Sequence, residues 1–429
     1  MEISSKKRIL IITYEMIPFN DSWGGCQRMY YLADSLASNN YNISVASCKL
    51  TNKPNYYDQT INFNQLFIEH PIKILSTKTV YNHQPTTKES YKLLKNIIKY
   101  IIYTLDRVFF NEPNKGMGII SFFWVQKAYS KIKNYIIKNN IDTLIISGPP
   151  FTLFSIAKKI KKSLKSLKII FDYRDPWNLW NNNKYLPFFK EKKCLNSADL
   201  VSVTTDSLRD TMQHKFNLSN CKTIFNGYSD ELWSKVKPRT TRNDKIIISY
   251  IGSIDFNRGS FRDTAEFFKA YEMLRCKNLF EIRFIGTIET DRVKELIKEF
   301  PEIIFKPKVS VIKSLELMRD SNYLLNIHTS KDESSKYLMG AKILDYLRSG
   351  KTIISINDSD SFEHKFLKGK NAILCVNDYR EILKVLEGIS QKNISSTTYD
   401  STKMLEVKEI QMYSREFQNE KFVKIIKNL

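Results

Sequence analysis

Short runs of apolar and β-branched residues alternate with longer stretches of helical periodicity in this chain of 429 residues. The first series comprises predicted strands at residues 8–13, 43–47, 143–147 and 168–171 and predicted helices at 26–39 and 152–167. Strands that are apolar throughout are covered on both faces, and such strands are joined by crossover helices in parallel sheets. The pattern therefore predicts a doubly wound parallel α/β domain.

The same alternation restarts in the second half of the chain. It comprises predicted strands at residues 246–251, 281–285, 323–327 and 352–356 and predicted helices at 262–275, 290–299 and 340–349. Residues 226–244 between the two series are polar and basic with one proline, which is typical of a linker. We predict an amino-terminal domain over 1–225, a linker over 226–244, and a second domain over 245–408, facing the first across a central cleft.

Composition limits the function classes. With 42% hydrophobic and 26% charged residues, the chain can form a substantial core, which excludes a wholly disordered protein. A formal charge of +22 favours nucleic acid, an anionic membrane face or a nucleotide-linked substrate as partner. The six cysteines are scattered without a CxxC pair, so neither a disulfide framework nor a zinc knuckle is indicated, and a reducing cytoplasm fits best.

The apolar runs are too short for a targeting or spanning segment. The amino-terminal run ends at Glu15 without a small-residue cleavage site, so we interpret it as a first buried strand and not as a signal peptide. The apolar region 93–105 is broken by Lys95 and Lys99, well short of the ~20 residues that a spanning helix needs. We expect no transmembrane segment and a cytoplasmic location.

Ligands of doubly wound domains bind at the carboxyl ends of the strands, so the loops that follow strands are the places to search. The first such loop ends in Gly24 and Gly25 and leads directly into a helix. Paired glycines let a backbone approach a ligand, and a helix amino terminus attracts an anion such as phosphate. A plain turn with a glycine cap is the alternative. The GxGxxG spacing of a dinucleotide site is absent.

The second loop follows the strand at 168–171 and reads Asp172-Tyr173-Arg174-Asp175-Pro176-Trp177. Sugar faces stack on indoles, and carboxylates accept hydrogen bonds from sugar hydroxyls. Exposed Arg174, Asp175 and Trp177 would therefore form a carbohydrate surface. The alternative is a structural Arg–Asp pair with tryptophans in the core.

The third and fourth loops belong to the second series. Gly252, Ser253 and Arg258 follow its first strand, and a guanidinium beside a helix start would neutralise a diphosphate. A solvated loop arginine is the alternative. Lys342 and Asp345 lie three residues apart on one predicted helix, where they could meet a phosphate and a ribose hydroxyl, or could form only an exposed ion pair.

Metal binding is disfavoured by the spacing of potential ligands. Asp358-Ser359-Asp360 mimics a metal-binding DxD motif, but it lies late in the chain, in a loop after a predicted strand. The five histidines show no close pairing of metal-ligand spacing. We expect neither a divalent cation nor another cofactor.

Several motifs, in this order, resemble those of GT-B glycosyltransferases of the family 4 type, in particular the bacterial surface-polysaccharide branch. The resemblance covers nearly the whole chain and rests on Gly24-Gly25, Gly148-Pro149-Pro150, Arg174-Asp175-Pro176-Trp177, Asn226-Gly227-Tyr228, Gly252 with Arg258-Gly259, and Lys342-Ile343-Leu344-Asp345-Tyr346-Leu347 with Gly350-Lys351. Asp345 and Tyr337 stand where fuller members carry a glutamate pair, and Ser253 stands where a basic residue is frequent.

The resemblance implies a retaining, metal-independent hexosyltransferase-type enzyme of cell-surface glycan synthesis, such as lipopolysaccharide or capsule. A nucleotide-sugar donor would bind mainly to the second domain, through Gly252, Ser253, Arg258, Lys342 and Asp345. A glycan or lipid-linked acceptor would bind to the first domain, and residues 409–429 would form a helix that returns to it. In a retaining transfer the leaving phosphate can act as base, so no dedicated protein nucleophile is required. Asp175, with Arg174, is then the candidate for orienting the acceptor or for stabilising positive charge at the anomeric carbon. Asp172 could do the same.

Three further readings stay open. Residues 91–105 place Leu94, Ile97, Ile98, Ile101 and Leu105 at helical spacing with interleaved lysines, which suits either peripheral contact with the anionic inner face of the plasma membrane or an amphipathic core helix. A nucleic-acid binder would explain the charge, yet no RNP signature, zinc finger or recognition helix is present, so we expect no nucleic acid partner. A nucleotide-sugar epimerase could use the same two domains without an acceptor.

Overall fold

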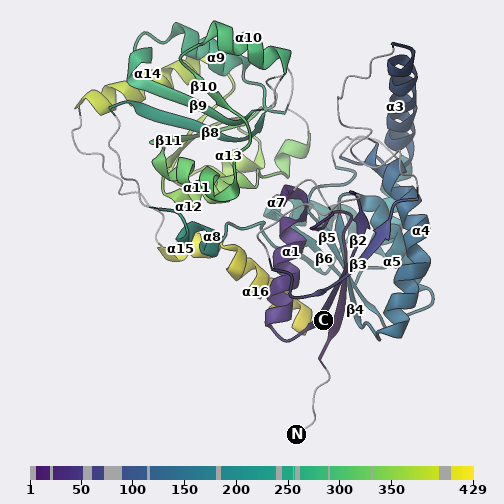
Figure 1. Ribbon diagram of the computed structural model, residues 1–429. Coiled ribbons are helices and arrows are strands. Elements are labelled where there is room, and N and C mark those ends of the chain that lie inside the picture. Colours follow the sequence, from purple (N-terminus) through teal and green to yellow (C-terminus); the bar gives the residue numbers. More distant parts are fainter. Residues whose placement is uncertain are drawn as a thin grey trace. The chain divides into compact units, whose positions relative to one another are not determined.

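The computed structural model describes residues 6–19, 23–51, 60–71, 89–113, 116–179, 185–237, 244–254, 256, 261–287, 290–329, 333–395 and 407–429. The chain divides into two compact units (Figure 1). Unit 1 contains residues 1–225 and 419–429, and unit 2 contains residues 226–418. Residues 226–237, which the sequence assigns to a linker, instead carry a short helix and belong to unit 2.

Within the described part of unit 1, a seven-stranded parallel sheet has the order β3-β2-β1-β4-β5-β6-β7. Its strands are β1 (Arg8–Ile12), β2 (Asn42–Lys49), β3 (Asn64–Glu69), β4 (Thr143–Gly148), β5 (Lys168–Tyr173), β6 (Leu200–Val203) and β7 (Cys221–Thr223). Its helices are α1 (Trp23–Ser38), α3 (Glu89–Phe109), α4 (Met117–Lys138), η2 (Phe151–Leu153), α5 (Phe154–Lys161), α6 (Tyr185–Leu195) and α7 (Asp206–Phe216).

Helices cover both faces of this sheet, as the apolar strands require. In Figure 1, α1 lies on one side of the sheet, and α4 and α5 lie on the other. Every residue of β4 is buried, so this central strand contacts helices on both faces. The end of helix α16 (Arg415–Lys427) adds Phe422 and Ile426 to the core that Ile9 and Ile11 form with α1.

Within the described part of unit 2, a six-stranded parallel sheet has the order β10-β9-β8-β11-β12-β13. Its strands are β8 (Ile246–Ile254), β9 (Phe280–Thr287), β10 (Ile304–Lys306), β11 (Tyr323–His328), β12 (Thr352–Asn357) and β13 (Ala372–Cys375). Its helices are α8 (Asp230–Ser234), α9 (Ala265–Met273), η3 (Lys277–Leu279), α10 (Asp291–Glu299), α11 (Val311–Asp320), η4 (Glu333–Lys336), α12 (Lys342–Ser349), α13 (Phe362–Leu367), α14 (Tyr379–Ser395) and α15 (Val407–Gln411).

The predicted fold class is confirmed: both units are doubly wound parallel α/β structures. The predicted strands recur with small changes at their ends, and the strands β3, β6, β7, β10 and β13 were not predicted. The order of each sheet reverses beside its first strand, because β1 lies between β2 and β4 and β8 lies between β9 and β11. Such a reversal is the place where sheets of this kind bind ligands.

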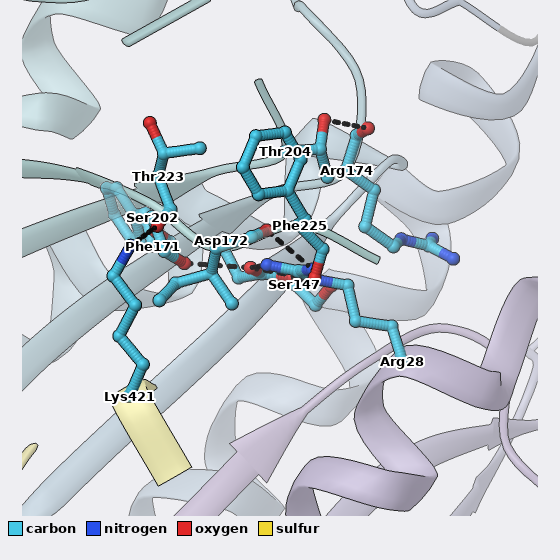
Figure 2. Close-up of polar contacts among 11 residues, drawn as sticks. Arg28, Ser147, Phe171, Asp172, Arg174, Ser202, Thr204, Thr223, Phe225 and Lys421 are labelled. Carbon is cyan, nitrogen blue, oxygen red and sulfur yellow. Dashed lines mark hydrogen bonds and ion pairs between the residues drawn. The ribbon is translucent and has the colours of Figure 1, made fainter. Parts of the chain in front are cut away.

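A buried ion pair connects α1 to the sheet of unit 1 (Figure 2). Asp172 at the end of β5 is wholly buried, and one of its carboxylate oxygens lies 2.8 Å from Nη2 of Arg28 on α1. Ser147 on β4 and Ser202 on β6 also donate hydrogen bonds to this carboxylate. Burial opposes ionisation of Asp172, but the charge and hydrogen bonds of Arg28 and the two serines hold its pKa below the ordinary value.

Replacement of Asp172 by asparagine should destabilise unit 1 by about 3–5 kcal/mol, because it leaves the Arg28 charge buried without its counter-ion. Urea unfolding followed by tryptophan fluorescence measures the change, since four of the five tryptophans belong to unit 1. The matched control is Asp210→Asn, which removes an ion pair of the same 2.8 Å length whose Asp side chain is 65% exposed. The control should change stability by about 1 kcal/mol or less.

The same pair predicts a pH dependence with a defined sign. Because the pKa of Asp172 is lower in the folded state, its stabilisation is present above about pH 4 and is lost as the pH falls through the lowered folded value. The stability difference between the native protein and Asp172→Asn should therefore shrink on acidification below pH 4. A difference independent of pH would contradict the ion-pair assignment.

Candidate active site

The carboxyl edge of the sheet of unit 2 brings two glycine-containing strand ends together. Gly252 and Ser253 lie near the end of β8, where both are accessible to solvent to some degree. Gly286 near the end of β9 has a φ of +102°, and a Cβ at this position would lie 2.5 Å from the Gly252 carbonyl oxygen. Only glycine allows this approach of the two backbones, which keeps bulky side chains away from this part of the edge.

The loop after β8 contributes a guanidinium to this edge. The predicted Arg258 lies outside the described residues, but Arg262 in the same loop donates from Nη1 to the Ser253 carbonyl oxygen over 2.9 Å. The loop is also bonded to the end of β11, because the Asp263 amide donates to Oγ1 of Thr329 and the Thr329 amide donates to the Phe261 carbonyl. Arg262 is thus held beside Ser253.

A buried tyrosine fixes helix α12 against the same edge. The hydroxyl of Tyr346 accepts a hydrogen bond from the Ile251 amide over 2.9 Å and lies 3.4 Å from the Leu325 carbonyl oxygen, so it bridges β8 and β11. Ile251 is the residue before Gly252. The first turns of α12, which carry Lys342 and Asp345, therefore lie at the same edge as the β8 loop.

Positive charge gathers where α12 begins. Lys342 is accessible to solvent, but the atoms packed around it partly desolvate its ammonium and lower the ammonium pKa. Asp345 opposes this shift, and the charges of Lys308 and Arg262 add to it, so both cations lie within electrostatic reach of Lys342. Like charges repel, and a bound anion would remove that cost. We call Arg262, Lys308 and Lys342 the basic cluster.

Asp345 lies beside the basic cluster but is partly engaged elsewhere. Its Oδ1 accepts a hydrogen bond from Nε1 of Trp233 on α8 over 3.1 Å. Burial raises the pKa of the Asp345 carboxyl, while the charges of Arg415 and Lys342 and the bond from Trp233 oppose the rise. The structure thus places Lys342 and Asp345 together, as the sequence predicts, and adds Trp233 as the partner that orients the carboxylate.

A second buried carboxylate holds the segment that precedes α12. Glu363 on α13 accepts hydrogen bonds from the Gly340 amide and from Nδ2 of Asn326, and its Oε1 lies 3.1 Å from Nδ1 of His328. Burial opposes ionisation, but His328, Asn326 and Gly340 hold the pKa of Glu363 below its ordinary value. The anchored Gly340 is two residues before Lys342.

In unit 1, the carboxyl edge carries a different set of charges. The Arg174 amide after β5 donates to the Gly148 carbonyl over 2.9 Å, and its guanidinium donates to the Pro149 carbonyl. Burial raises the pKa of both Asp175 and Glu15, and the Arg174 charge opposes the rise in both. Arg174 therefore lies within electrostatic reach of two partly exposed carboxyls with raised pKa values, and perturbed groups of this kind are frequent at functional sites.

The roles of Asp172 and Asp175 are separated by burial. Asp172 is wholly buried and bound to Arg28, so it is structural. Asp175 is three residues further along, partly exposed, and beside Arg174. Figure 2 shows the Arg174 side chain extending away from the Asp172–Arg28 pair. Only Asp175 of the two can meet a ligand.

The predicted exposure of Trp177 is wrong. The residue is 2% exposed, its ring stacks on Phe151 with the centroids 5.2 Å apart, and its Nε1 donates to the Phe110 carbonyl over 2.7 Å. A tryptophan can bury its ring where its one donor finds an acceptor, and here the end of α3 supplies that acceptor. No face of Trp177 is left for a sugar.

Gly24 and Gly25 lie inside the first turn of α1, because the helix begins at Trp23 and not after the glycines. The sequence places both in a loop before the helix. Their amides nevertheless belong to the first turn, where helix N–H groups have no intrahelical acceptor. They stay candidates for phosphate or acceptor contact.

Sequence reasoning missed four residues of these two edges. Glu15 lies three residues after the end of β1, Arg262 lies eight residues after the end of β8, and Lys308 lies two residues after the end of β10. Position after a strand could have singled out these three. Glu363 carries no such signal, because it lies in a helix and its partners come from β11 and the segment before α12. No group of three potential metal ligands converges within the described ranges.

No family model matches the chain, and no curated protein matches it in sequence. Solved structures match it along its length. An E. coli trehalose-6-phosphate structure bound with UDP-2-fluoro glucose has a TM-score of 0.62 and 12% identity, covering 99% of both chains. A UDP-forming trehalose-phosphate synthase from Burkholderia xenovorans has a TM-score of 0.61 and 12% identity, also covering 99% of both.

An epimerase is also similar in structure. The UDP-GlcNAc 2-epimerase from Methanocaldococcus jannaschii has a TM-score of 0.54 and 9% identity, covering 99% of this chain and 100% of that one. At these identities the similarity establishes the fold and not the reaction. The chain has the GT-B fold, with two Rossmann-like units.

Proposed function

We propose that this protein is a glycosyltransferase of the family 4 type that moves a sugar from a nucleotide-diphosphate donor to a glycan or lipid-linked acceptor in cell-surface glycan synthesis. The observation that carries the proposal is the basic cluster of Arg262, Lys308 and Lys342 at the carboxyl edge of unit 2. A diphosphate neutralises such a cluster, and its growing charge during bond cleavage is what the cations stabilise.

Asp345 complements the diphosphate in this proposal. The Asp345 carboxylate is held by Trp233 and lies on the same turn of α12 as Lys342. In this proposal it accepts hydrogen bonds from the ribose hydroxyls of the donor. Gly252 and Gly286 carry no side chain at these strand ends, so none of their own atoms lies between a phosphate and the backbone. Arg258 lies outside the described residues, and it stays the further guanidinium that the sequence predicts for this donor site.

The reaction proceeds with retention and without a metal ion. The acceptor hydroxyl attacks the anomeric carbon from the face that the nucleotide leaves, and the departing phosphate takes its proton. The bond between the anomeric carbon and the phosphate oxygen breaks as the new glycosidic bond forms. Asp175, set by Arg174, orients the acceptor hydroxyl or steadies positive charge at the anomeric carbon.

A nucleotide-sugar epimerase is the second candidate, favoured by the structural match to a UDP-GlcNAc 2-epimerase. It uses a donor site of the same chemistry but needs no acceptor. Incubation with a nucleotide sugar alone distinguishes the two: an isomerised sugar nucleotide supports the epimerase, whereas consumption only after acceptor addition supports transfer.

A thermal-shift panel of UDP, GDP, ADP and CMP compounds tests the donor site. A ligand at 100 times its dissociation constant stabilises the folded protein by about 2.7 kcal/mol. We expect a nucleoside diphosphate or its sugar to raise the melting temperature and CMP compounds to leave it unchanged. No shift with any diphosphate would contradict the proposal.

Lys342→Ala should weaken binding of that diphosphate by about tenfold to a hundredfold, because it removes a charge-assisted contact. Lys342→Arg should retain most of the affinity, since it keeps the charge. The matched control is Lys313→Ala on α11, an exposed lysine that pairs only with Glu316 at 2.9 Å among the described residues. Calorimetric titration measures all three, and equal affinities for Lys342→Ala and Lys313→Ala would remove Lys342 from the site.

Asp175→Asn should lower kcat by about 10²-fold or more while leaving donor affinity within a factor of two to three, because Asp175 acts on the acceptor or on the developing charge. Steady-state transfer assays and donor titration separate these effects. Asp210→Asn, an exposed aspartate of the same unit, serves as the control. A normal kcat for Asp175→Asn would exclude the catalytic assignment.

A further inference from the structure

The apolar stripe of α3 faces solvent and not the core. Ile97, Ile101, Leu105 and Val108 follow one another along one side of the helix, and their exposed fractions are 47%, 50%, 40% and 51%. An amphipathic core helix would bury this side. The exposure therefore contradicts the core interpretation for residues 97–105, whose side chains are described.

Exposed apolar side chains are concentrated around this helix. Among the described residues, 11 of the 19 exposed large apolar side chains lie on α3, on the beginning of α4 and on α6. Phe122 of α4 contacts the Phe110 ring directly after α3, and Lys190 of α6, next in the chain to the exposed Phe189, lies over the Phe109 and Phe110 rings. Exposed apolar patches of this kind mark interaction surfaces. We call this surface the docking face.

Cations predominate among the exposed charges beside the docking face. Of the carboxylates on α3 to α6 whose side chains are described, Asp106 and Glu191 are 2% and 0% exposed, and Glu112 between α3 and α4 is 7% exposed. Exposed cations are present on all four helices, including Arg107, Lys127 and Lys192. An apolar stripe with these exposed cations around it complements a bilayer surface, where hydrocarbon lies beneath an anionic headgroup layer.

Helix α3 is suited to lie on such a surface and not to cross it. Within the described residues, no helix combines the length and apolarity needed to span a bilayer. In Figure 1, α3 extends beyond the other helices of unit 1, which leaves its stripe accessible along its length. A projecting helix with an exposed apolar stripe and nearby cations has the features of a helix that lies at an anionic bilayer surface.

We propose that the docking face of unit 1 binds the surface of a bilayer that contains anionic lipids, with the α3 stripe inserted among the lipids and the surrounding lysines and arginines at the headgroups. The inference does not rest on donor chemistry, but it deepens the proposed function, because it brings lipid-linked acceptors to unit 1. Each cation near the surface contributes roughly fivefold in affinity, so binding is reduced by salt and by removal of the anionic lipid.

Co-flotation with vesicles tests the proposal. The full-length protein should float with vesicles prepared from phosphatidylcholine and about 30% phosphatidylglycerol, which supplies the anionic headgroups. It should float much less with vesicles of phosphatidylcholine alone. Ile97→Ser/Ile101→Ser should lower partitioning by roughly tenfold or more, because two apolar side chains lose their insertion. The matched control Ile297→Ser changes an isoleucine of unit 2 with the same exposed fraction, 47%, and should partition normally.

A site-specific probe locates the contact. Tyr100 on α3 is 73% exposed, so Tyr100→Trp should fold normally, and its fluorescence should shift to the blue on anionic vesicles and be quenched by brominated lipids. No blue shift, or equal partitioning of the Ile97→Ser/Ile101→Ser and Ile297→Ser variants, would overturn the proposal. A concentration-dependent dimer that the double variant abolishes, without vesicle binding, would assign the face to a second copy and also overturn it.

The thermal-shift panel of nucleotides distinguishes a failure of the membrane-binding proposal from a failure of the proposed glycosyltransferase function. The Ile97→Ser/Ile101→Ser variant should show the same thermal shift with the nucleotide as the native protein, because its changes lie on α3 of unit 1 and the basic cluster lies in unit 2. Vesicle binding without any nucleotide shift would support the docking face and contradict the donor site. A nucleotide shift without vesicle binding would do the reverse.

Discussion

When helices cover both faces of a parallel sheet, polar side chains find room only at the ends of the strands. Each unit has one buried carboxylate at that end, and this carboxylate fixes a helix or a loop against the sheet. Asp172 binds Arg28 and thereby fixes α1 against the sheet of unit 1. Glu363 binds the Gly340 amide and thereby fixes the segment before α12 in unit 2. In both cases the pKa is lowered against the effect of burial, so the carboxylate stays charged where an unpaired one would be neutral.

Buried and accessible charged groups therefore differ in what they contact. Buried, fully bonded carboxylates position the helices, and the accessible groups next to them are left for ligands. Asp175 is accessible because Asp172 takes the structural position three residues earlier, and Lys342 is accessible because Gly340 and Tyr346 bear the anchoring contacts on either side of it. Side chains that were also needed to hold the fold could not rearrange around a substrate without cost.

The sequence predicts the parts that depend on periodicity and chain order, and it fails where the partner is remote. Strands, crossover helices and the edge positions of Lys342 and Asp345 follow from local pattern. The burial of Trp177 does not, because its acceptor is the Phe110 carbonyl, far away in the chain. Glu363 is missed for the same reason.

The stripe of α3 shows a second limit. Helical spacing identifies Ile97, Ile101 and Leu105 as one side of a helix, but period alone cannot tell a side that faces the core from one that faces solvent. The contacts made by the opposite side decide the question. Asp106 accepts a hydrogen bond from the Gly118 amide at the start of α4, and Ile102 is buried, so the helix packs through that side and exposes the stripe.

These packing contacts also connect the docking face to the Asp175 loop. Trp177, two residues after Asp175, donates to the carbonyl of Phe110 directly after α3, and Asn178 donates to Glu191 on α6 over 2.9 Å. Asn111 in turn donates to Asn178. The end of α3, α6 and the loop after β5 are therefore one hydrogen-bonded block whose polar groups are buried, and such groups are costly to separate.

If the docking face binds a bilayer as proposed, that block would give the buried Trp177 a positioning role in place of the predicted sugar stacking. A helix bound to a bilayer fixes the depth of a reacting group only if the two are rigidly joined. A flexible loop would let Asp175 move relative to the bilayer surface. Because the indole is held between Phe151 and the end of α3, a bilayer bound at the docking face would lie at a fixed position relative to Asp175. An acceptor confined to that bilayer would then meet the carboxylate in a narrow range of depths, which is the geometric requirement for transfer to a lipid-linked sugar.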